Sequence, residues 1–322
     1  MTTCTKGTGF LRSGIAHAFL TFTCFGITNF LLGFIVERCE NPAHASLAAP
    51  VVLWLGCGLL GMAFILSPAG RTMLRHARIR GLDLIMAIAG GVFLAIGMLT
   101  LKLGFLSDPG SKGPITAVTA ANAVLVALFA RRLLGERLVV YQWAGILITM
   151  GGISVMGLSI GGEAALRGLL FGLATLTCFG ITNTLLKVLG YRGVPSMPAA
   201  LIVWLSVGAC GIAGTMILAI SAKGIAGMQP HWLYGVALSA GVSLGIGMWS
   251  LKRGVTLSRA GPVVAIAGSN AVLVTIMDLA VFGHLPSTLK LGGMLAALAG
   301  VGVLAVSGNN IQYTPGNKDH LA

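Results

Sequence analysis

The sequence has few charged residues and very few acidic ones. Only 9% of its 322 residues are charged, and eight Asp and Glu residues stand against 21 Lys and Arg residues. Soluble globular domains usually carry about 25% charged residues, so this scarcity excludes an ordinary soluble domain. Hydrophobic residues make up 56% of the chain, and the mean hydropathy is +0.93. Apolar stretches of about 20 residues recur, long enough as helices to cross a bilayer. The composition therefore predicts an all-α polytopic membrane protein.

Motifs of metal and nucleotide chemistry are also missing. The six cysteines form no CxxC pair, and the sequence has no HExxH and no GxxxxGK[ST]. GxSxG occurs at 157–161 and 241–245, but at the end of or within apolar helical segments and not at a strand-to-helix turn, so no nucleophile elbow is indicated. We therefore expect no catalytic residues, no metal, no cofactor and no ATP-binding loop within the chain. The net charge of +13 does not indicate a nucleic-acid partner, because the basic residues lie in short loops between apolar segments.

Ten apolar segments are predicted to cross the membrane. They lie at about 14–36, 47–66, 82–102, 114–130, 139–159, 168–189, 198–221, 232–251, 262–283 and 289–307. Pro114 and Pro262 open the fourth and ninth segments, where a missing backbone N–H costs nothing. Residues 309–322 are expected to form a cytoplasmic tail.

The chain is internally duplicated. TCFGITN occurs at residues 23–29 and again at 177–183, and GPITAVTAANAVLV from Gly113 corresponds to GPVVAIAGSNAVLV from Gly261. Related stretches keep the same order roughly 150 residues apart, as expected for two copies of one unit. We place the two repeats at residues 13–160 and 168–308.

The basic loops predict how the repeats are oriented. Three basic-rich loops, at 71–80, 131–137 and 252–259, fall on one side of a ten-span topology. Because Lys and Arg concentrate in cytoplasmic loops, we expect both termini in the cytoplasm. Each repeat has five spans, an odd number, so the second must enter the membrane from the opposite side. Inverted repeats of this kind are typical of secondary transporters that work by alternating access.

The stretch GPITAVTAANAVLVALFARRLLGERL, residues 113–138, resembles the EamA-like, ten-helix branch of the drug/metabolite transporter superfamily. The Leu-Lys pairs at 101–102 and 251–252 contribute to this resemblance. It implies a transporter, by analogy an exporter, and leaves the solute open. Two departures are visible: Asn122 and Asn270 stand where the family often has proline. The second half has Gly283-His284 where the first has Gly135-Glu136, so a family role for that glutamate carries over to Glu136 alone.

Polar residues inside the spans are the candidates for binding a solute. Asn122 and Asn270 occupy equivalent mid-span positions, and an amide offers donors and acceptors to a polar solute. Thr116 and Thr119 share a helix face with Asn122. The other interpretation of such residues is hydrogen bonding between helices, for which asparagine is well suited.

Weaker candidates lie on the duplicated segments. Thr28 and Thr182 belong to equivalent polar stripes that face protein or a cavity, although threonines often bond back to the preceding helical turn. Trp54 and Trp204 are equivalent residues that fit a cavity wall and simple packing equally well.

Ionisable residues within spans suggest coupling or steering. Asp278 could carry a coupling proton or pair structurally, and His17 is a second protonatable candidate. Lys102 and Lys252 lie at equivalent span ends, where they could attract an anionic solute or extend toward the interface.

These features together predict a secondary transporter of a small polar metabolite, such as an amino acid, in the cell (inner) membrane. The expected partners are the solute, the bilayer, a coupling proton and, as an open possibility, a second copy in a homodimer. One alternative is a flippase or carrier for a lipid-linked or nucleotide-linked head group, favoured if Lys102 and Lys252 face a groove. Another is a membrane sensor or scaffold that transports nothing.

Overall fold

The computed structural model describes residues 14–76, 79, 81–133, 138–158, 163–220, 228–257, 263 and 266–307. Within these ranges the regular secondary structure is helical, without strands. The all-α class predicted from the composition is therefore confirmed. The 309–322 tail and Glu136 lie outside the described residues.

The first half of the chain supplies one set of helices: α1 (Gly14–Arg38), α2 (Pro42–Leu66), the short α3 (Pro68–His76), α4 (Gly81–Ser107), the 3-10 turn η2 (Pro109–Ser111), α5 (Lys112–Ala120), α6 (Asn122–Leu133) and α7 (Val140–Leu158). The second half supplies the other: α8 (Glu163–Tyr191), α9 (Ser196–Ile220), α10 (Trp232–Leu257), α12 (Asn270–Phe282) and α13 (Thr288–Ser307).

Local sequence signals explain several helix ends. Asn41 caps α2, its side-chain oxygen accepting a hydrogen bond from the His44 backbone N–H at 3.1 Å, and Pro42 follows at the first helical position. Gly283 ends α12 with φ at +71°, a left-handed conformation that glycine adopts without strain.

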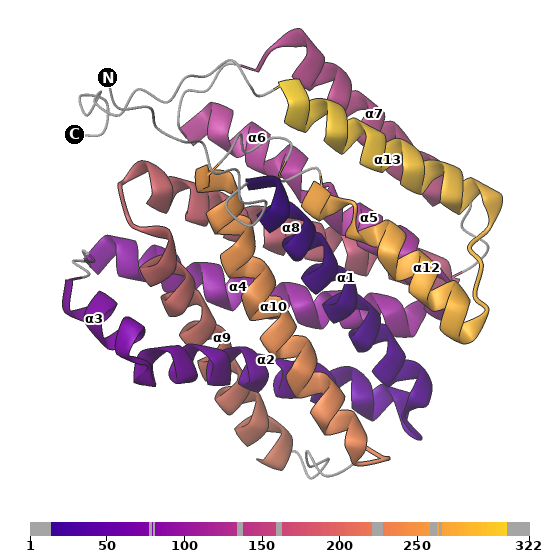
Figure 1. The fold of residues 1–322 in the computed structure, drawn as a ribbon. Coiled ribbons are helices and arrows are strands. Elements are labelled where there is room, and N and C mark those ends of the chain that lie inside the picture. The colour runs from indigo at the N-terminus through magenta and orange to yellow at the C-terminus, as the bar shows by residue number, and fades with distance from the viewer. Residues whose placement is uncertain are drawn as a thin grey trace.

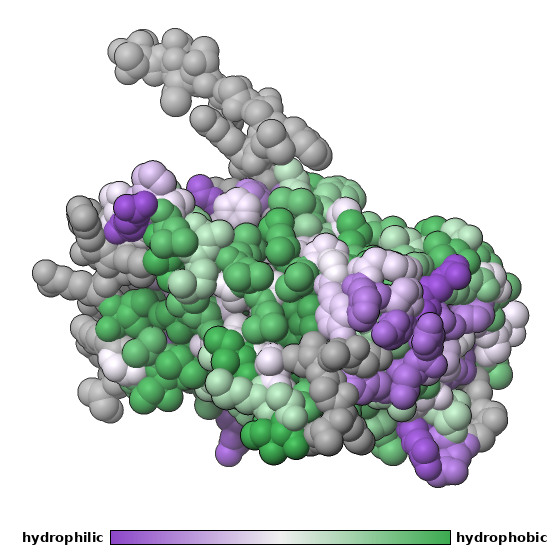
Figure 2. Space-filling view, turned by 90° about the horizontal axis from the view of Figure 1, so that it is seen from below, coloured by the Kyte–Doolittle hydropathy of each residue, from purple (hydrophilic) through white to green (hydrophobic). Residues whose placement is uncertain are grey.

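Seven helical segments are long and apolar enough to cross a membrane, and three shorter apolar helices accompany them in the part of the chain described: Val140–Met156, Ile266–Phe282 and Thr288–Leu304. Large apolar side chains are exposed on their outer faces, among them Leu147, Ile217 and Ile220. Figure 2 shows one face on which apolar residues cover a broad area. A polytopic membrane protein fits these features, while the count of ten crossings stays a prediction.

The two halves interlock, and their contacts come in equivalent pairs. Helix α1 packs on α10 and α4 packs on α8, which are the same contact with the halves exchanged. Helix α2 packs on its counterpart α9, and α7 packs on its counterpart α13 along the upper right of Figure 1. Helix α5 packs on α12, which also joins the two halves. The α2–α9 crossing is close because Gly58 and Gly208 face one another there. The core is therefore largely shared between the halves.

The predicted fourth and ninth spans are each interrupted near their middle. The first divides into α5 and α6 at Ala121, and a turn at Ser269 immediately precedes α12 at the equivalent place. Backbone bonds of the i to i−3 type, Ala121 N–H to the Val118 carbonyl and Ser269 N–H to the Ile266 carbonyl, mark both interruptions. Each apolar segment, Pro109–Leu133 and Ile266–Phe282, runs on through its turn, and the helix resumes at an asparagine.

Candidate functional site

A cavity of about 80 Å³ lies between the halves, where the two interrupted helices meet α1, α4, α8 and α10. A buried water needs roughly 10–15 Å³ by this kind of measure, so the cavity has room for several waters or a small solute. Its lining residues form pairs related by the duplication, with Leu251 and Thr182 in addition: Phe25 and Phe179, Asn29 and Asn183, Leu94 and Leu244, Met98 and Met248, Thr119 and Ala267, Ala120 and Gly268, Asn122 and Asn270.

This pairing places the cavity between equivalent positions of the two halves of the chain. A pocket formed by chance packing would not draw the same positions from both halves. The one polar difference within the pairs is Thr119, which corresponds to Ala267. The lining is therefore nearly symmetric, with one hydroxyl from each repeat that has no equivalent hydroxyl in the lining, Thr119 and Thr182.

Four asparagines provide most of the polar lining, in two pairs that cross between the repeats. The Asn29 amide nitrogen donates to Asn270 Oδ1 at 3.0 Å, and the Asn183 amide nitrogen donates to Asn122 Oδ1 at 2.8 Å. Asn270 and Asn122 then donate to carbonyls three residues earlier, Ala267 and Thr119, each at 2.7 Å. The two arrangements are equivalent bond by bond.

Each pair leaves an acceptor available at the cavity. Among the described residues, the side-chain oxygens of Asn29 and Asn183 accept no hydrogen bond, and both residues line the cavity. The interrupted helices contribute a complementary charge, since α6 begins at Asn122 and α12 at Asn270. A helix N-terminus carries partial positive charge and unpaired N–H groups. The cavity therefore offers both acceptors and positive helix ends.

No ionisable side chain lines the cavity among the described residues. Beside the asparagines and threonines it presents the rings of Phe25 and Phe179 and the side chains of Met98 and Met248. Such a lining suits a solute that is neutral or zwitterionic and has an apolar part. A net charge would lack a counter-ion here, and an uncompensated charge away from water is costly.

The structure separates the predicted threonines. Thr119 and Thr182 line the cavity, whereas Thr116 is 1% exposed and bonds the Lys112 carbonyl. Thr28 is fully buried, and its hydroxyl donates to the Ala240 carbonyl of α10 at 3.1 Å. The Thr182 hydroxyl makes the equivalent bond to Gly90 of α4 at 3.0 Å. Both of these threonines thus join helices of opposite halves.

The tryptophans lie in the packed core. Trp54 and Trp204 are 7% and 3% exposed, belong to the same cluster of buried residues on α2 and α9, and do not line the cavity. Their indole nitrogens have no hydrogen-bond partner within the described residues. The sequence left open whether these tryptophans form a cavity wall or pack in the core, and their placement fits packing in the core.

The two lysines also lie away from the cavity. The Lys102 side chain is fully buried, and its ammonium donates to the Leu32 carbonyl of α1. Lys252 is half-buried near the end of α10. Extension toward the interface, one of the two interpretations given for Lys102, does not fit this residue, because its side chain is buried in protein.

The two protonatable candidates do not form one site. His17 Nδ1 lies 3.1 Å from the Ser250 hydroxyl, and its ring packs edge-on against Trp249. It is twenty residues from Glu37 on the same helix, roughly 30 Å at 1.5 Å per residue. Asp278 is 3% exposed and forms an ion pair with Lys112 beside Glu37 and His284.

Sequence reasoning missed several of these residues. Asn29 and Asn183 were not among the predicted site residues, yet both line the cavity. Their exact recurrence in TCFGITN was the available signal. Lys112 precedes the predicted fourth segment, which was placed at about 114–130, yet it begins α5 and is fully buried.

Comparison with known proteins supports the fold alone. No family model matches the chain, and no curated protein matches it. Among 24 matching chains of solved structures, one described only as the crystal structure of a protein aligns with a TM-score of 0.60. It shares 17% identity and covers 93% of this chain and 100% of its own. A known architecture therefore extends over nearly the whole chain, without indicating a function.

Proposed function

We propose that this protein is a secondary transporter that moves a small neutral or zwitterionic solute, an amino acid or a similar metabolite, by alternating access. In this proposal the chain crosses the cell (inner) membrane ten times as two inverted five-helix repeats, with both termini in the cytoplasm. The resemblance to the drug/metabolite transporter superfamily agrees with this assignment and suggests export.

One observation carries the proposal: the cavity is lined by equivalent residues of both repeats where two interrupted helices begin. Inverted-repeat transporters bind their solutes at the repeat interface, next to discontinuous helices whose N-termini face anionic groups. Here a solute carboxylate would lie near the starts of α6 and α12. A solute ammonium group would meet the side-chain oxygens of Asn29 and Asn183.

The lining also bears on the alternatives. A carrier for an anionic head group was favoured only if Lys102 and Lys252 faced a groove, and neither lines the cavity. A sensor or scaffold would have no need for equivalent polar residues from both repeats around a cavity of solute size.

The test is uptake of labelled zwitterionic amino acids into proteoliposomes that contain the purified protein. We expect saturable uptake for at least one of them and a loss of about tenfold in Asn183→Ala, because a single lost hydrogen bond to a charged group costs about 1.5 kcal/mol. Thr177→Ala is the matched control, since Thr177 lies on the same helix but is exposed and bonds only the Leu173 carbonyl. Folded protein without saturable flux of any solute tested would contradict the proposal.

A further inference from the structure

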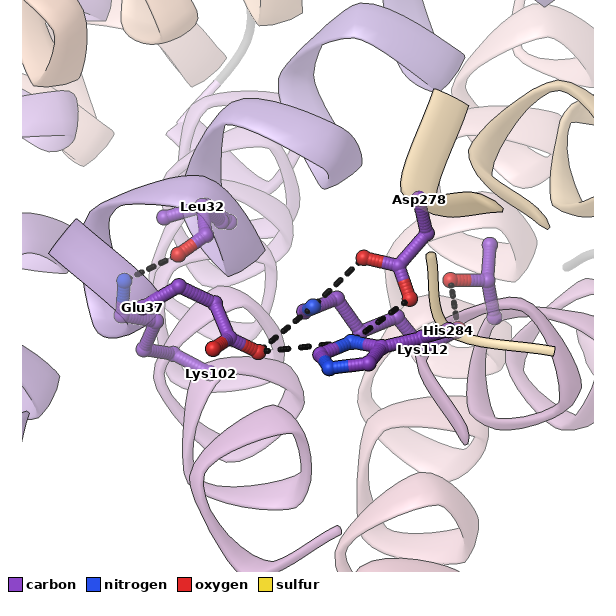
Figure 3. A network of polar contacts seen from close by, with 7 residues as sticks. Leu32, Glu37, Lys102, Lys112, Asp278 and His284 are labelled. Atoms are coloured by element: carbon purple, nitrogen blue, oxygen red, sulfur yellow. Dashed lines mark hydrogen bonds and ion pairs between the residues drawn. The ribbon is translucent and has the colours of Figure 1, made fainter. Parts of the chain in front are cut away.

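Four titratable side chains meet at one end of the bundle, separate from the cavity (Figure 3). The Lys112 ammonium lies between two carboxylates, 2.5 Å from Asp278 Oδ1 and 2.9 Å from Glu37 Oε1. The Lys112 side chain is fully buried and that of Asp278 is 4% exposed. These residues come from α5, α12 and α1, so the cluster joins the two halves of the chain.

His284 completes the cluster from the segment after α12. Its Nδ1 lies 3.5 Å from Asp278 Oδ2 and 3.7 Å from Glu37 Oε1. This nitrogen is buried and makes no hydrogen bond within the part of the chain described. Neutral imidazole carries one N–H, so Nδ1 either donates without adding charge or turns a lone pair toward the two carboxylates. Imidazolium both donates from Nδ1 and places a positive charge beside the two carboxylates.

The charge balance of the four side chains also favours a proton on His284. With a neutral imidazole, two carboxylates share the single ammonium of Lys112. A proton on His284 gives two cations and two anions in alternation, which is favourable in a poorly solvated site. A metal ion could not take this role without displacing Lys112, whose ammonium already occupies the place between the carboxylates.

Two lysines near the cluster have hydrogen-bond partners outside it. Lys102, from α4, donates to the Leu32 carbonyl. Lys290, on α13, bonds Asp108 at 2.7 Å and the Ser111 hydroxyl at 2.6 Å.

Around the cluster, the Phe282 ring stacks on His284 at 5.8 Å and faces both Lys112 and the guanidinium of Arg38. The buried Cys39 thiol also lies at this end of α1.

Two of the four side chains reach the surface of the bundle. The His284 and Glu37 side chains are 34% and 21% exposed, whereas Asp278 behind them is nearly closed off. The cluster has no copy in the other repeat: Tyr191 corresponds to Glu37, and Ala130 to Asp278. The site is therefore confined to one end of the molecule, whereas the cavity is shared.

We propose that Lys112, Glu37, Asp278 and His284 form a proton-binding site in which one proton from bulk water is held on His284 Nδ1 between the two carboxylates. If the proposed transport function holds, this is the site that couples solute movement to a proton gradient. Asp278 begins the connection to the cavity, since it lies two turns along α12 from Asn270, about 12 Å at 1.5 Å per residue.

The site can be tested without any solute, by titrating the protein in lipid nanodiscs with protons. Histidine side chains labelled with ¹³C and ¹⁵N are followed by NMR, and His284→Gln identifies the His284 signal. We expect this signal to change from imidazolium to neutral imidazole as the pH rises. At a fixed pH within that range, the protonated-to-neutral ratio should fall about tenfold in Asp278→Asn, because an opposite charge within about 4–6 Å is removed.

Glu37→Gln should lower the ratio as well, and it is the safer variant because Glu37 is partly exposed. The signals of His17 and His231, which belong to other contacts, serve as internal controls for folding. A His284 signal that stays neutral down to pH 5, or that ignores both substitutions, would overturn the proton site. Solute flux that persists in proteoliposomes but is indifferent to a pH gradient would overturn the coupling role while leaving the transporter assignment intact.

Discussion

The crossed asparagine pairs give a quantitative prediction. Asn122 takes part in two side-chain hydrogen bonds, one accepted from Asn183 and one donated to the Thr119 carbonyl, whereas Asn183 takes part in one. Hydrogen bonds between helices in membrane proteins average about 0.6 kcal/mol. Asn122→Ala should therefore lower the free energy of unfolding by about 1.2 kcal/mol and Asn183→Ala by about 0.6 kcal/mol, at that average per bond.

The double variant should cost no more than Asn122→Ala alone, because both single substitutions remove the shared bond. The coupling energy within the pair is then about 0.6 kcal/mol by the same average. The equivalent pair supplies an independent repeat of the experiment, with Asn270→Ala in the place of Asn122→Ala and Asn29→Ala in the place of Asn183→Ala.

The assay is reversible unfolding in mixed micelles, with the four single variants and the two double variants measured together. The expected outcome is the same order of effects and the same coupling in both pairs. Coupling energies indistinguishable from zero in both cycles would refute the claim that the asparagines act as cross-repeat pairs. A coupling in only one cycle would refute their equivalence.

Two further predictions concern stability. A Cβ at Gly58 would lie 2.6 Å from the Gly208 Cα across the α2–α9 crossing, so Gly58→Ala should cost about 1–3 kcal/mol by overpacking. Gly292→Ala, where nothing lies within 4 Å, should be neutral or stabilising by up to about 1 kcal/mol, and equal effects at both glycines would refute the close crossing. Lys112→Met leaves two carboxylates without their cation and should cost about 3 kcal/mol or more. Arg167→Met breaks an exposed ion pair and should cost about 0.5 kcal/mol or less in the same unfolding assay. Equal losses of unfolding free energy in Lys112→Met and Arg167→Met would contradict the prediction that the buried ion pair stabilises the fold more than the exposed one.

Much of the fold could be predicted from hydropathy and from the internal repeat of this one sequence. Hydropathy and the TCFGITN repeat pointed to membrane helices in two related halves, and the helices lie within a few residues of most predicted segments. The interruptions at Ala121 and Ser269 were missed because neither residue is a helix breaker. There the backbone turns where an asparagine side chain bonds a carbonyl three residues back, a local bond that hydropathy does not register.

Only part of the candidate site could be predicted, because hydropathy does not show which helices pack together. Asn122 and Asn270 stood out as amides in the middle of apolar spans, and both line the cavity. Their partners Asn29 and Asn183 come from the opposite repeat, and that crossing depends on how α1 and α8 pack. The ion cluster required three distant segments to converge on Lys112, which sequence spacing does not reveal.

The most direct test of the central claim is a structure of the protein with a transported amino acid bound. We expect the solute in the cavity between Phe25 and Phe179, with its carboxylate near the starts of α6 and α12 and its ammonium group near the Asn29 and Asn183 oxygens. A solute bound anywhere else, with the cavity holding only water, would contradict it.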